Sequence, residues 1–411
     1  MASLDASSSA FSEATFIPPD SIFDVTRRYL ADTTPNKVNL GQGTYRDADG
    51  KPWILPSVRS AKGEIAAADC GHEYLPIAGL KSFRDEAVKL AFHGTKALEE
   101  NRIASCQAIS GTGALLLTGL ALKRASPKVK TIYITEPTWS NHQLLFESLG
   151  FAVQTIPYYK AGHFDFESYI SVLSDIKADG SSAVVLHACA HNPTGCDPSR
   201  EQWKAIAAVV KEKHIFPIFD AAYLGFNSGN VDEDAWAIRY FVEDLHLEAA
   251  VCLSFAKSMG LYGERIGLTS FVAGSSDLAR TMQSVLENVQ RATVSNPPAY
   301  GARIVAQVLG TPDIKTQWDE DLGVMSGRIR TMRERLYEEL VKAKTPGSWE
   351  HIVKQSGMFA YTGLEPAQVV HLEDKWHVYM AETGRISIAG LNESNVVYFA
   401  EAVDSTVRTV K

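Results

Sequence analysis

Short apolar runs alternate with segments of helical periodicity between about residues 50 and 320. The clearest β-branched or apolar runs are 131–135, 183–187, 216–220 and 250–254. Such alternation predicts an α/β fold in which a mostly parallel sheet is flanked by helices. Each run ends in polar or reactive residues, and open α/β sheets bind ligands at the carboxyl ends of their strands. We therefore expect a site assembled from strand ends.

A different pattern follows this region. Apolar residues at helical spacing, set among many charges, predict one long helix over 313–343. The Ser/Ala-rich start of the chain ends in a Pro-Pro break and predicts an N-terminal arm over residues 1–18. We expect a large domain over 51–324 and a smaller α/β domain built from 19–50 and 325–411.

Composition narrows the possible partners and locations. With 411 residues, 45% of them hydrophobic, the chain can bury a large core. Its net charge of -8 and the lack of a Lys/Arg cluster argue against nucleic acid as a partner. The sequence shows no secretory, mitochondrial or peroxisomal signal and no membrane-spanning stretch, so we expect a cytoplasmic protein.

The cysteines also bear on location and metal binding. They are odd in number, widely scattered and without metal-ligand spacing, which predicts reduced core thiols and no metal site. Their positions are Cys70, Cys106, Cys189, Cys196 and Cys252.

A small-residue turn, Ser110-Gly111-Thr112-Gly113, precedes an apolar helical run. Hydroxyls and unpaired N–H groups at a helix N-terminus suit a phosphate. An ordinary helix cap explains the same residues equally well. The turn lacks the Gly-Lys-Ser/Thr of a nucleotide P-loop and the third glycine of a dinucleotide fingerprint.

Two other strand ends carry groups that can act together. The first offers Ser254, Lys257 and Arg265, and a buried lysine beside a fixed cation can act as an amine nucleophile towards an aldehyde. The second offers Asp220 and Tyr223, and a pyridinium nitrogen needs an anion of this kind. Most lysines are merely solvated, so the inference depends on the combination.

Two further segments follow strand-like runs. In the run 187–195, Pro193 and Gly195 favour a turn that directs Asn192 back at the site, although Asn-Pro often marks a plain turn. Trp139 could stack on a flat ring, although a single tryptophan more often belongs to the core. These segments complete the set of candidate site residues.

The combined motifs resemble aspartate aminotransferases, within the fold-type I pyridoxal-phosphate enzymes. The resemblance runs from residue 37 to residue 385 and includes ordered phrases at 71–76, 136–139, 191–195, 261–265 and 295–298. It implies a large cofactor-binding domain, with a mostly parallel sheet flanked by helices, and a smaller α/β domain.

The resemblance also implies how pyridoxal 5'-phosphate is held. Lys257 would form the internal aldimine and shuttle a proton, and Asp220, supported by His142, would pair with the pyridine nitrogen. Tyr223 and Asn192 would hydrogen-bond the phenolate oxygen. Trp139 would stack on the ring and take part in catalysis. The implied phosphate ligands are Ser110, Gly111, Thr112, Ser254, Arg265 and, from the other subunit, Tyr74.

For the substrate, the resemblance implies an arginine at each end. Arg385 would clamp the α-carboxylate, and Arg291 from the partner subunit would bind the distal carboxylate. Gly43, Trp139 and Asn192 would also line the substrate site. The implied enzyme is a homodimer that converts L-aspartate and 2-oxoglutarate to oxaloacetate and L-glutamate by ping-pong kinetics.

Several residues depart from the family pattern, and three of them keep alternatives open. Gln42, Thr44 and Glu382 stand where apolar or neutral residues are usual. A specialised enzyme with the same cofactor could catalyse β-decarboxylation, β-substitution or an altered transamination. A non-catalytic binding protein is a further alternative, although such a role would not require the lysine, aspartate and arginine described above.

Overall fold

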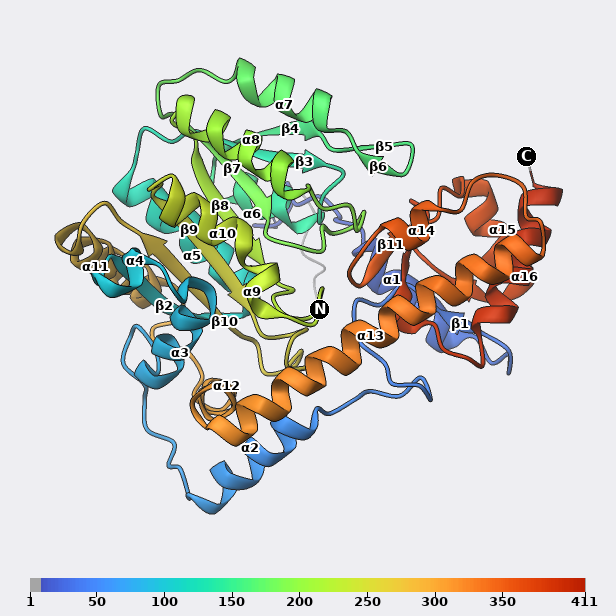
Figure 1. Cartoon of the computed structure of the whole chain (residues 1–411), viewed down its shortest axis with the longest axis horizontal. Helices are drawn as coiled ribbons and strands as arrows, with labels where there is room; N and C mark the ends of the chain where they lie inside the picture. Colours follow the sequence, from blue (N-terminus) through green and yellow to red (C-terminus); the bar gives the residue numbers. More distant parts are fainter. Residues whose placement is uncertain (1–8, 411) are drawn as a thin grey trace.

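The computed structural model describes residues 9–410, which form a part built on a central sheet and a smaller part (Figure 1). The strands of the sheet are β2 (Ile103–Ile109), β3 (Thr131–Glu136), β4 (Ala152–Pro157), β7 (Ser182–His187), β8 (Phe216–Ala221), β9 (Ala249–Ser254) and β10 (Ile266–Val272). Their order is β2-β10-β9-β8-β7-β3-β4. Strand β10 is antiparallel to both neighbours and the other pairs are parallel, which confirms the mostly parallel sheet.

Helices cover both faces of this sheet because its inner strands are apolar on both sides. In β7, Ala183 and Val185 belong to one buried cluster, whereas Val184 and Leu186 belong to the other. The first cluster includes side chains of α5 (Ser110–Ala125), α6 (Asn141–Ser148) and α11 (Ser276–Thr293). The second includes side chains of α3 (Lys81–Phe92), α7 (Phe166–Asp175) and α8 (Arg200–Glu212).

One long helix, α13 (Pro312–Lys342), connects the two parts. Its bounds confirm the predicted helix within one residue at each end. At 1.5 Å per residue it is about 46 Å long, and in Figure 1 it crosses from α2 (Pro56–Ala67) and α12 (Tyr300–Gly310) to the smaller part. Its predicted apolar stripe is buried along its whole length. The helix therefore contributes to the core of both parts.

The smaller part joins segments from both ends of the chain. Strand β1 (Val38–Asn39) pairs with β12 (Val378–Tyr379), and β11 (Phe359–Tyr361) pairs with β13 (Arg385–Ser387). Its helices are α1 (Ser21–Ala31), α14 (His351–Lys354), α15 (Pro366–Trp376), the 3-10 helix η3 (Ile388–Gly390) and α16 (Val396–Thr409). This pairing is consistent with the domain bounds predicted at residues 50 and 324, which stay a prediction.

The remaining elements are short, and the arm is only partly described. They are α4 (Lys96–Glu99), the hairpin of β5 (Tyr159–Lys160) and β6 (His163–Phe164), α9 (Val231–Asp234), α10 (Trp236–Arg239) and the π-helix η2 (Tyr240–Asp244). Of the predicted arm, residues 1–8 lie outside the described residues. Within 9–410, no helix is both long and apolar enough to cross a membrane.

Candidate active site

The predicted site residues come together where neighbouring parallel strands end. Because β3, β7, β8 and β9 run in the same direction, their carboxyl ends lie at one edge of the sheet. His187 at the end of β7 is paired with Asp220 of β8, and Lys257 follows the end of β9. Asp220 lies in the predicted run, one residue before the end of β8, which pairs through this residue with both neighbouring strands.

A chain of hydrogen bonds runs behind the Asp220 carboxylate. His142 Nε2 lies 2.9 Å from Asp220 Oδ2, and His142 Nδ1 lies 2.9 Å from Thr138 Oγ1. Thr138 Oγ1 lies 3.1 Å from His187 Nε2, and the backbone N–H of Asn192 donates to His187 Nδ1 over 3.3 Å. The last bond fixes the tautomer of His187, because Nδ1 must accept and Nε2 then carries the proton.

The direction of the remaining bonds follows from this tautomer. His187 Nε2 donates to the Thr138 oxygen, the Thr138 hydroxyl donates to His142 Nδ1, and His142 Nε2 donates to Asp220. Burial lowers the pKa of His187 well below its usual value, in agreement with a neutral ring. Burial alone would raise the pKa of Asp220, but the hydrogen bond from His142 and the nearby charge of Lys257 lower it below its usual value. Asp220 is therefore a buried carboxylate that stays ionised at neutral pH.

Lys257 is half-buried, and its charge interacts with that of the Asp220 carboxylate. Its Nζ is 5.5 Å from the centroid of the Tyr223 ring. Burial lowers the pKa of Lys257, the charge of Arg265 lowers it further, and Asp220 opposes both. Burial and the charge of Asp220 raise the pKa of Tyr223 well above its usual value, so its hydroxyl keeps its proton. The site thus combines an activated amine with a hydrogen-bond donor.

The small-residue turn meets two other predicted segments. The Ser110 and Ser254 hydroxyl oxygens are 3.2 Å apart, and the Ser110 N–H donates to the carbonyl of Arg265 over 3.1 Å. Helix α5 begins at Ser110, earlier than predicted, and no side chain caps it. A Cβ on Gly111 would lie 3.2 Å from the Cβ of Ser254. The Ser110 side chain is therefore not an ordinary cap, and the N–H groups of the next two residues, Gly111 and Thr112, lie in the first turn of α5, where they have no carbonyl of their own helix to bind and suit an anion.

Arg385 presents a fixed cation from the smaller part. Its side chain is buried, its Nη2 donates to the Gly41 carbonyl over 2.8 Å, and its guanidinium carbon lies 4.3 Å from the centroid of the Phe359 ring. Its Nε is buried and has no partner among the described residues. A Cβ on Gly43 would lie 3.0 Å from Phe359 Cζ, so a larger residue would press on the ring beneath the guanidinium. The arrangement suits planar recognition of a carboxylate.

Two of the predicted site residues have exposed side chains on the described chain. Tyr74 is 89% exposed, and Arg291 is an exposed residue in the last turn of α11 that donates to the Ser295 hydroxyl. Exposure is what a residue that serves a partner's site requires. Trp139 is half-buried, with its ring edge-on to His142 at a centroid distance of 5.4 Å.

Two of the residues that depart from the family pattern, Gln42 and Thr44, carry polar groups with different surroundings. Gln42 Oε1 accepts a hydrogen bond from Arg46 Nη2 over 3.1 Å. The Thr44 hydroxyl is buried and has no partner among the described residues. Within 9–410, no cluster of His, Cys, Asp and Glu has the arrangement of a metal site.

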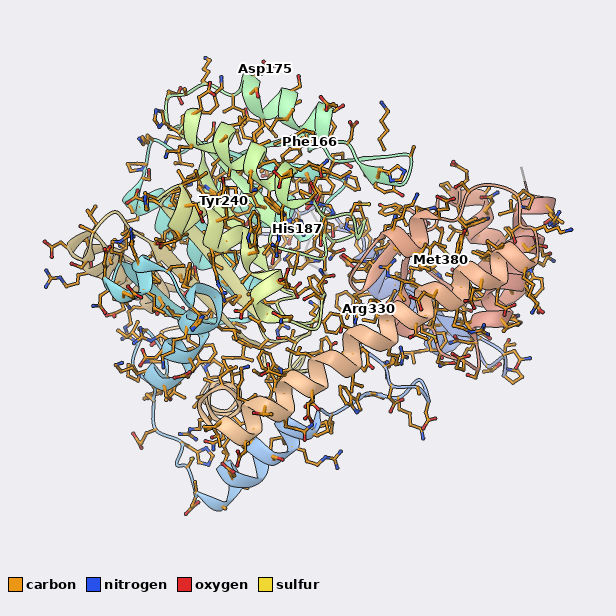
Figure 2. The ribbon with its side chains drawn as sticks, viewed as in Figure 1. Phe166, Asp175, His187, Tyr240, Arg330 and Met380 are labelled. Atoms are coloured by element: carbon orange, nitrogen blue, oxygen red, sulfur yellow. The ribbon has the colours of Figure 1, made fainter. Side chains whose placement is uncertain are left out.

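The sequence pattern assigns no site role to Thr138 or His187 and does not predict the contact between Phe359 and Arg385. The first two connect Asp220 to the Asn192 loop, and the third supports Arg385. Thr138 and His187 stand inside the segments 136–139 and 187–195, so the available signal was their position at the ends of strand-like runs. His187 is labelled in Figure 2, within the part that holds the central sheet.

Comparison with known proteins agrees with this geometry. The family Aminotransferase class I and II matches residues 35–403. The cytoplasmic aspartate aminotransferase of Schizosaccharomyces pombe is 47% identical, over 95% of this chain and 96% of that protein. The solved structure of the Saccharomyces cerevisiae cytoplasmic aspartate aminotransferase superposes with a TM-score of 0.94 at 42% identity, over 98% and 99% of the two chains. The aromatic-amino-acid aminotransferase of Burkholderia pseudomallei, solved covalently bound to pyridoxal phosphate, gives 0.93 at 38% identity, over 97% and 100%. The chain therefore belongs to the class I and II aminotransferases.

Proposed function

We propose that this chain is a pyridoxal-phosphate-dependent aspartate aminotransferase of the cytoplasm that converts L-aspartate and 2-oxoglutarate to oxaloacetate and L-glutamate. The similarity to cytoplasmic aspartate aminotransferases over nearly the whole chain supports this activity and location. The observation that carries the proposal is the meeting of three groups: the Lys257 amine with its lowered pKa, the buried Asp220 carboxylate and the Arg385 guanidinium.

The residues present fit pyridoxal phosphate. Asn192 Oδ1 and Arg385 Nε are buried and have no hydrogen-bond partner among the described residues, which indicates that the site binds a polar ligand. Lys257 offers an amine to an aldehyde, Asp220 offers an anion to a pyridine nitrogen, and the turn that begins at Ser110 offers donors to a phosphate. When bound, this cofactor supplies an electron-withdrawing ring that stabilises negative charge at the substrate's Cα.

Each side chain has a definite task in this proposal. Lys257 Nζ would hold the cofactor and, once released, carry the proton that leaves Cα. Asp220, oriented by His142, would keep a proton on the pyridine nitrogen. Tyr223 and Asn192 would donate to the ring's phenolate oxygen, and Trp139 would lie against the ring. The phosphate would be held by Ser110, Gly111, Thr112, Ser254 and Arg265.

Arginines would select dicarboxylic substrates. Arg385 would bind the α-carboxylate, and Arg291 of a second copy of this chain would bind the distal carboxylate. The same copy would contribute Tyr74 to the phosphate site. The exposure of Arg291 and Tyr74 supports this homodimer with shared sites.

The test is a substrate screen of pure holoenzyme. Incubation with L-aspartate and 2-oxoglutarate should yield oxaloacetate and L-glutamate, identified by mass spectrometry. The Lys257→Ala variant should bind the cofactor without the covalent link and should not transaminate. A colourless wild-type protein that takes up no pyridoxal phosphate would overturn the proposal and favour a non-catalytic binding role.

A second candidate is a specialised reaction of a related amino acid with the same cofactor. Two polar groups near Gly41 and Arg385 favour it, because they could meet a polar substrate. They are the Thr44 hydroxyl, which is buried without a partner among residues 9–410, and the Gln42 side-chain amide, which accepts a hydrogen bond from Arg46. The same screen should include cysteine sulfinate and aromatic amino acids. Oxaloacetate and glutamate as the sole rapid products would dismiss this candidate.

A further inference from the structure

Two segments pack closely against each other at the junction between the sheet part and the smaller part. The first, the 190–197 loop, carries Asn192, and the second, the 355–359 turn, carries Phe359 beneath Arg385. The Ser356 N–H donates to the carbonyl of Gly195 over 2.7 Å. This junction therefore joins a cofactor-site residue to the support of the substrate arginine.

Glycines allow the two segments to approach closely. A Cβ on Gly195 would lie 2.6 Å from the Ser356 carbonyl oxygen and 2.8 Å from that of Phe359. A Cβ on Gly357 would lie 2.5 Å from the Cβ of Ala190. Both glycines also have positive φ, 66° and 76°. Any larger residue on either side would force the segments apart.

Asp197 ties the loop to the turn. Its carboxylate accepts hydrogen bonds from the N–H groups of Ala190 at 2.7 Å and His191 at 2.8 Å, immediately before Asn192. It also accepts one from the Ser356 hydroxyl over 3.3 Å. One carboxylate therefore fixes the backbone that leads to Asn192 and contacts the opposite segment.

Arg333 of α13 fixes the turn from the other side. It is 2% exposed and donates to the carbonyls of Ile352 at 2.8 Å, Ser356 at 3.0 Å, Gly357 at 2.9 Å and Phe359 at 2.5 Å. Two of these oxygens, those of Ser356 and Phe359, are the ones that Gly195 approaches. Arg330, labelled in Figure 2, lies one turn earlier on the stretch of α13 between the two parts.

We propose that Asp197 and Arg333 are positioning residues that set the distance between the Asn192 amide and the Arg385 guanidinium. Neither residue touches the reacting groups, so each acts through the segment it holds. The inference rests on the proposed function, because it assigns Asn192 to the cofactor's phenolate oxygen and Arg385 to the substrate's α-carboxylate. A shift of either segment should change substrate binding and the phenolate's hydrogen bond together.

Three variants of the full-length holoenzyme test the proposal. Asp197→Asn replaces one of two accepting oxygens with a donor, Arg333→Lys removes the planar fork of donors, and Gly357→Ala wedges the segments apart without removing a polar group. Asp321→Asn is the matched control, because Asp321 is a buried carboxylate that accepts from the Ser57 N–H at 3.0 Å and the Ser57 hydroxyl at 2.5 Å, away from the junction.

Two quantities are measured for each protein: KM and kcat for L-aspartate, and the pH midpoint at which the cofactor's visible absorbance band changes. In the three junction variants we expect KM to rise about tenfold, more than kcat falls, and the midpoint to move up by about half a pH unit or more, since a weakened donor from Asn192 favours the protonated phenol. Asp321→Asn should lower the thermal midpoint of unfolding while KM and the absorbance midpoint stay at the wild-type values.

The outcomes separate this inference from the proposed function. If the wild type transaminates and the junction variants keep its KM and absorbance midpoint, Asp197 and Arg333 have no positioning role. The positioning role is likewise overturned if Asp321→Asn shifts both quantities as far as the junction variants do. A wild type without bound cofactor or transamination would instead overturn the proposed function.

Discussion

Replacing Thr138 with valine should cut the hydrogen-bond chain behind Asp220 at its centre. The substitution keeps the shape of the side chain and removes its hydroxyl. The bonds to His142 Nδ1 and His187 Nε2, at 2.9 and 3.1 Å, would both be lost. His142 is fully buried and His187 is 6% exposed, so solvent cannot readily replace the hydroxyl.

The expected loss of stability follows from the two histidine ring nitrogens that would lack a partner. A buried polar group without a partner costs about 1–3 kcal/mol, so the loss of two partners in Thr138→Val should lower the free energy of unfolding by about 2–6 kcal/mol. Catalysis should also suffer, because His142 loses the bond that orients it towards Asp220. We expect kcat to fall about tenfold, which corresponds to about 1.4 kcal/mol of transition-state stabilisation.

The assay compares wild type, Thr138→Val and Thr138→Ser. Urea unfolding of the holoenzyme at one fixed chain concentration gives stability, and oxaloacetate formation gives kcat. The serine variant keeps the hydroxyl and should lose less than about 1 kcal/mol. Equal stability and equal kcat in the valine and serine variants would refute the reasoning, because the chain of bonds would then contribute nothing.

Three further outcomes are expected. Arg385→Lys should lower kcat/KM for L-aspartate about 100-fold, since a single ammonium group replaces the two parallel donors of the planar guanidinium. The control variant Arg408→Lys, in the ion pair with Asp404, should leave kcat/KM unchanged. Iodoacetamide at pH 8 should modify at most one thiol of the native protein, that of the exposed Cys70. Burial raises the pKa of the other four thiols: to about 12 for Cys106, to about 11 for Cys196, and also upward for Cys189 and Cys252. Peptide mapping before and after unfolding checks this. The folded pKa of Asp220 lies below its unfolded value, so the ionised carboxylate stabilises the fold above about pH 4, and this stabilisation is lost as the pH falls through the folded pKa. The urea midpoints of unfolding at pH 3 and pH 7 should therefore differ less in Asp220→Asn than in wild type.

The sequence allowed the strand ends to be predicted because each buried strand is a short apolar run that stops at a polar group. Lys257 and Asn192 were predicted in this way, and the structure places them after β9 and β7. Strand β10 was not predicted, although the sequence carries a signal for its antiparallel direction. The connection 255–265 holds too few residues for the helical crossover that a parallel neighbour requires.

Other contacts could not be read from local pattern. Thr138 meets His187 because β3 and β7 are neighbours in the sheet, and the order of strands is a tertiary property. Phe359 lies under Arg385 because β11 pairs with β13, two strands of three residues each that carry almost no periodic signal. The predicted contribution of Arg291 and Tyr74 to a partner's site depends on a second chain and stays a prediction.

Arg333 is a charged residue at an apolar position of the pattern that predicts α13. It falls on the apolar stripe of α13, four residues after Ile329 and three before Leu336, and all three side chains are buried. A charged residue in such a stripe is buried at a high cost in desolvation, and burial lowers the pKa of Arg333 to about 9. That cost is offset here by hydrogen bonds from the two terminal nitrogens of the guanidinium to four backbone carbonyls, three of them in the 355–359 turn. An arginine inside a helical apolar stripe therefore predicts a fixed backbone turn nearby, and in this chain that turn supports the substrate arginine.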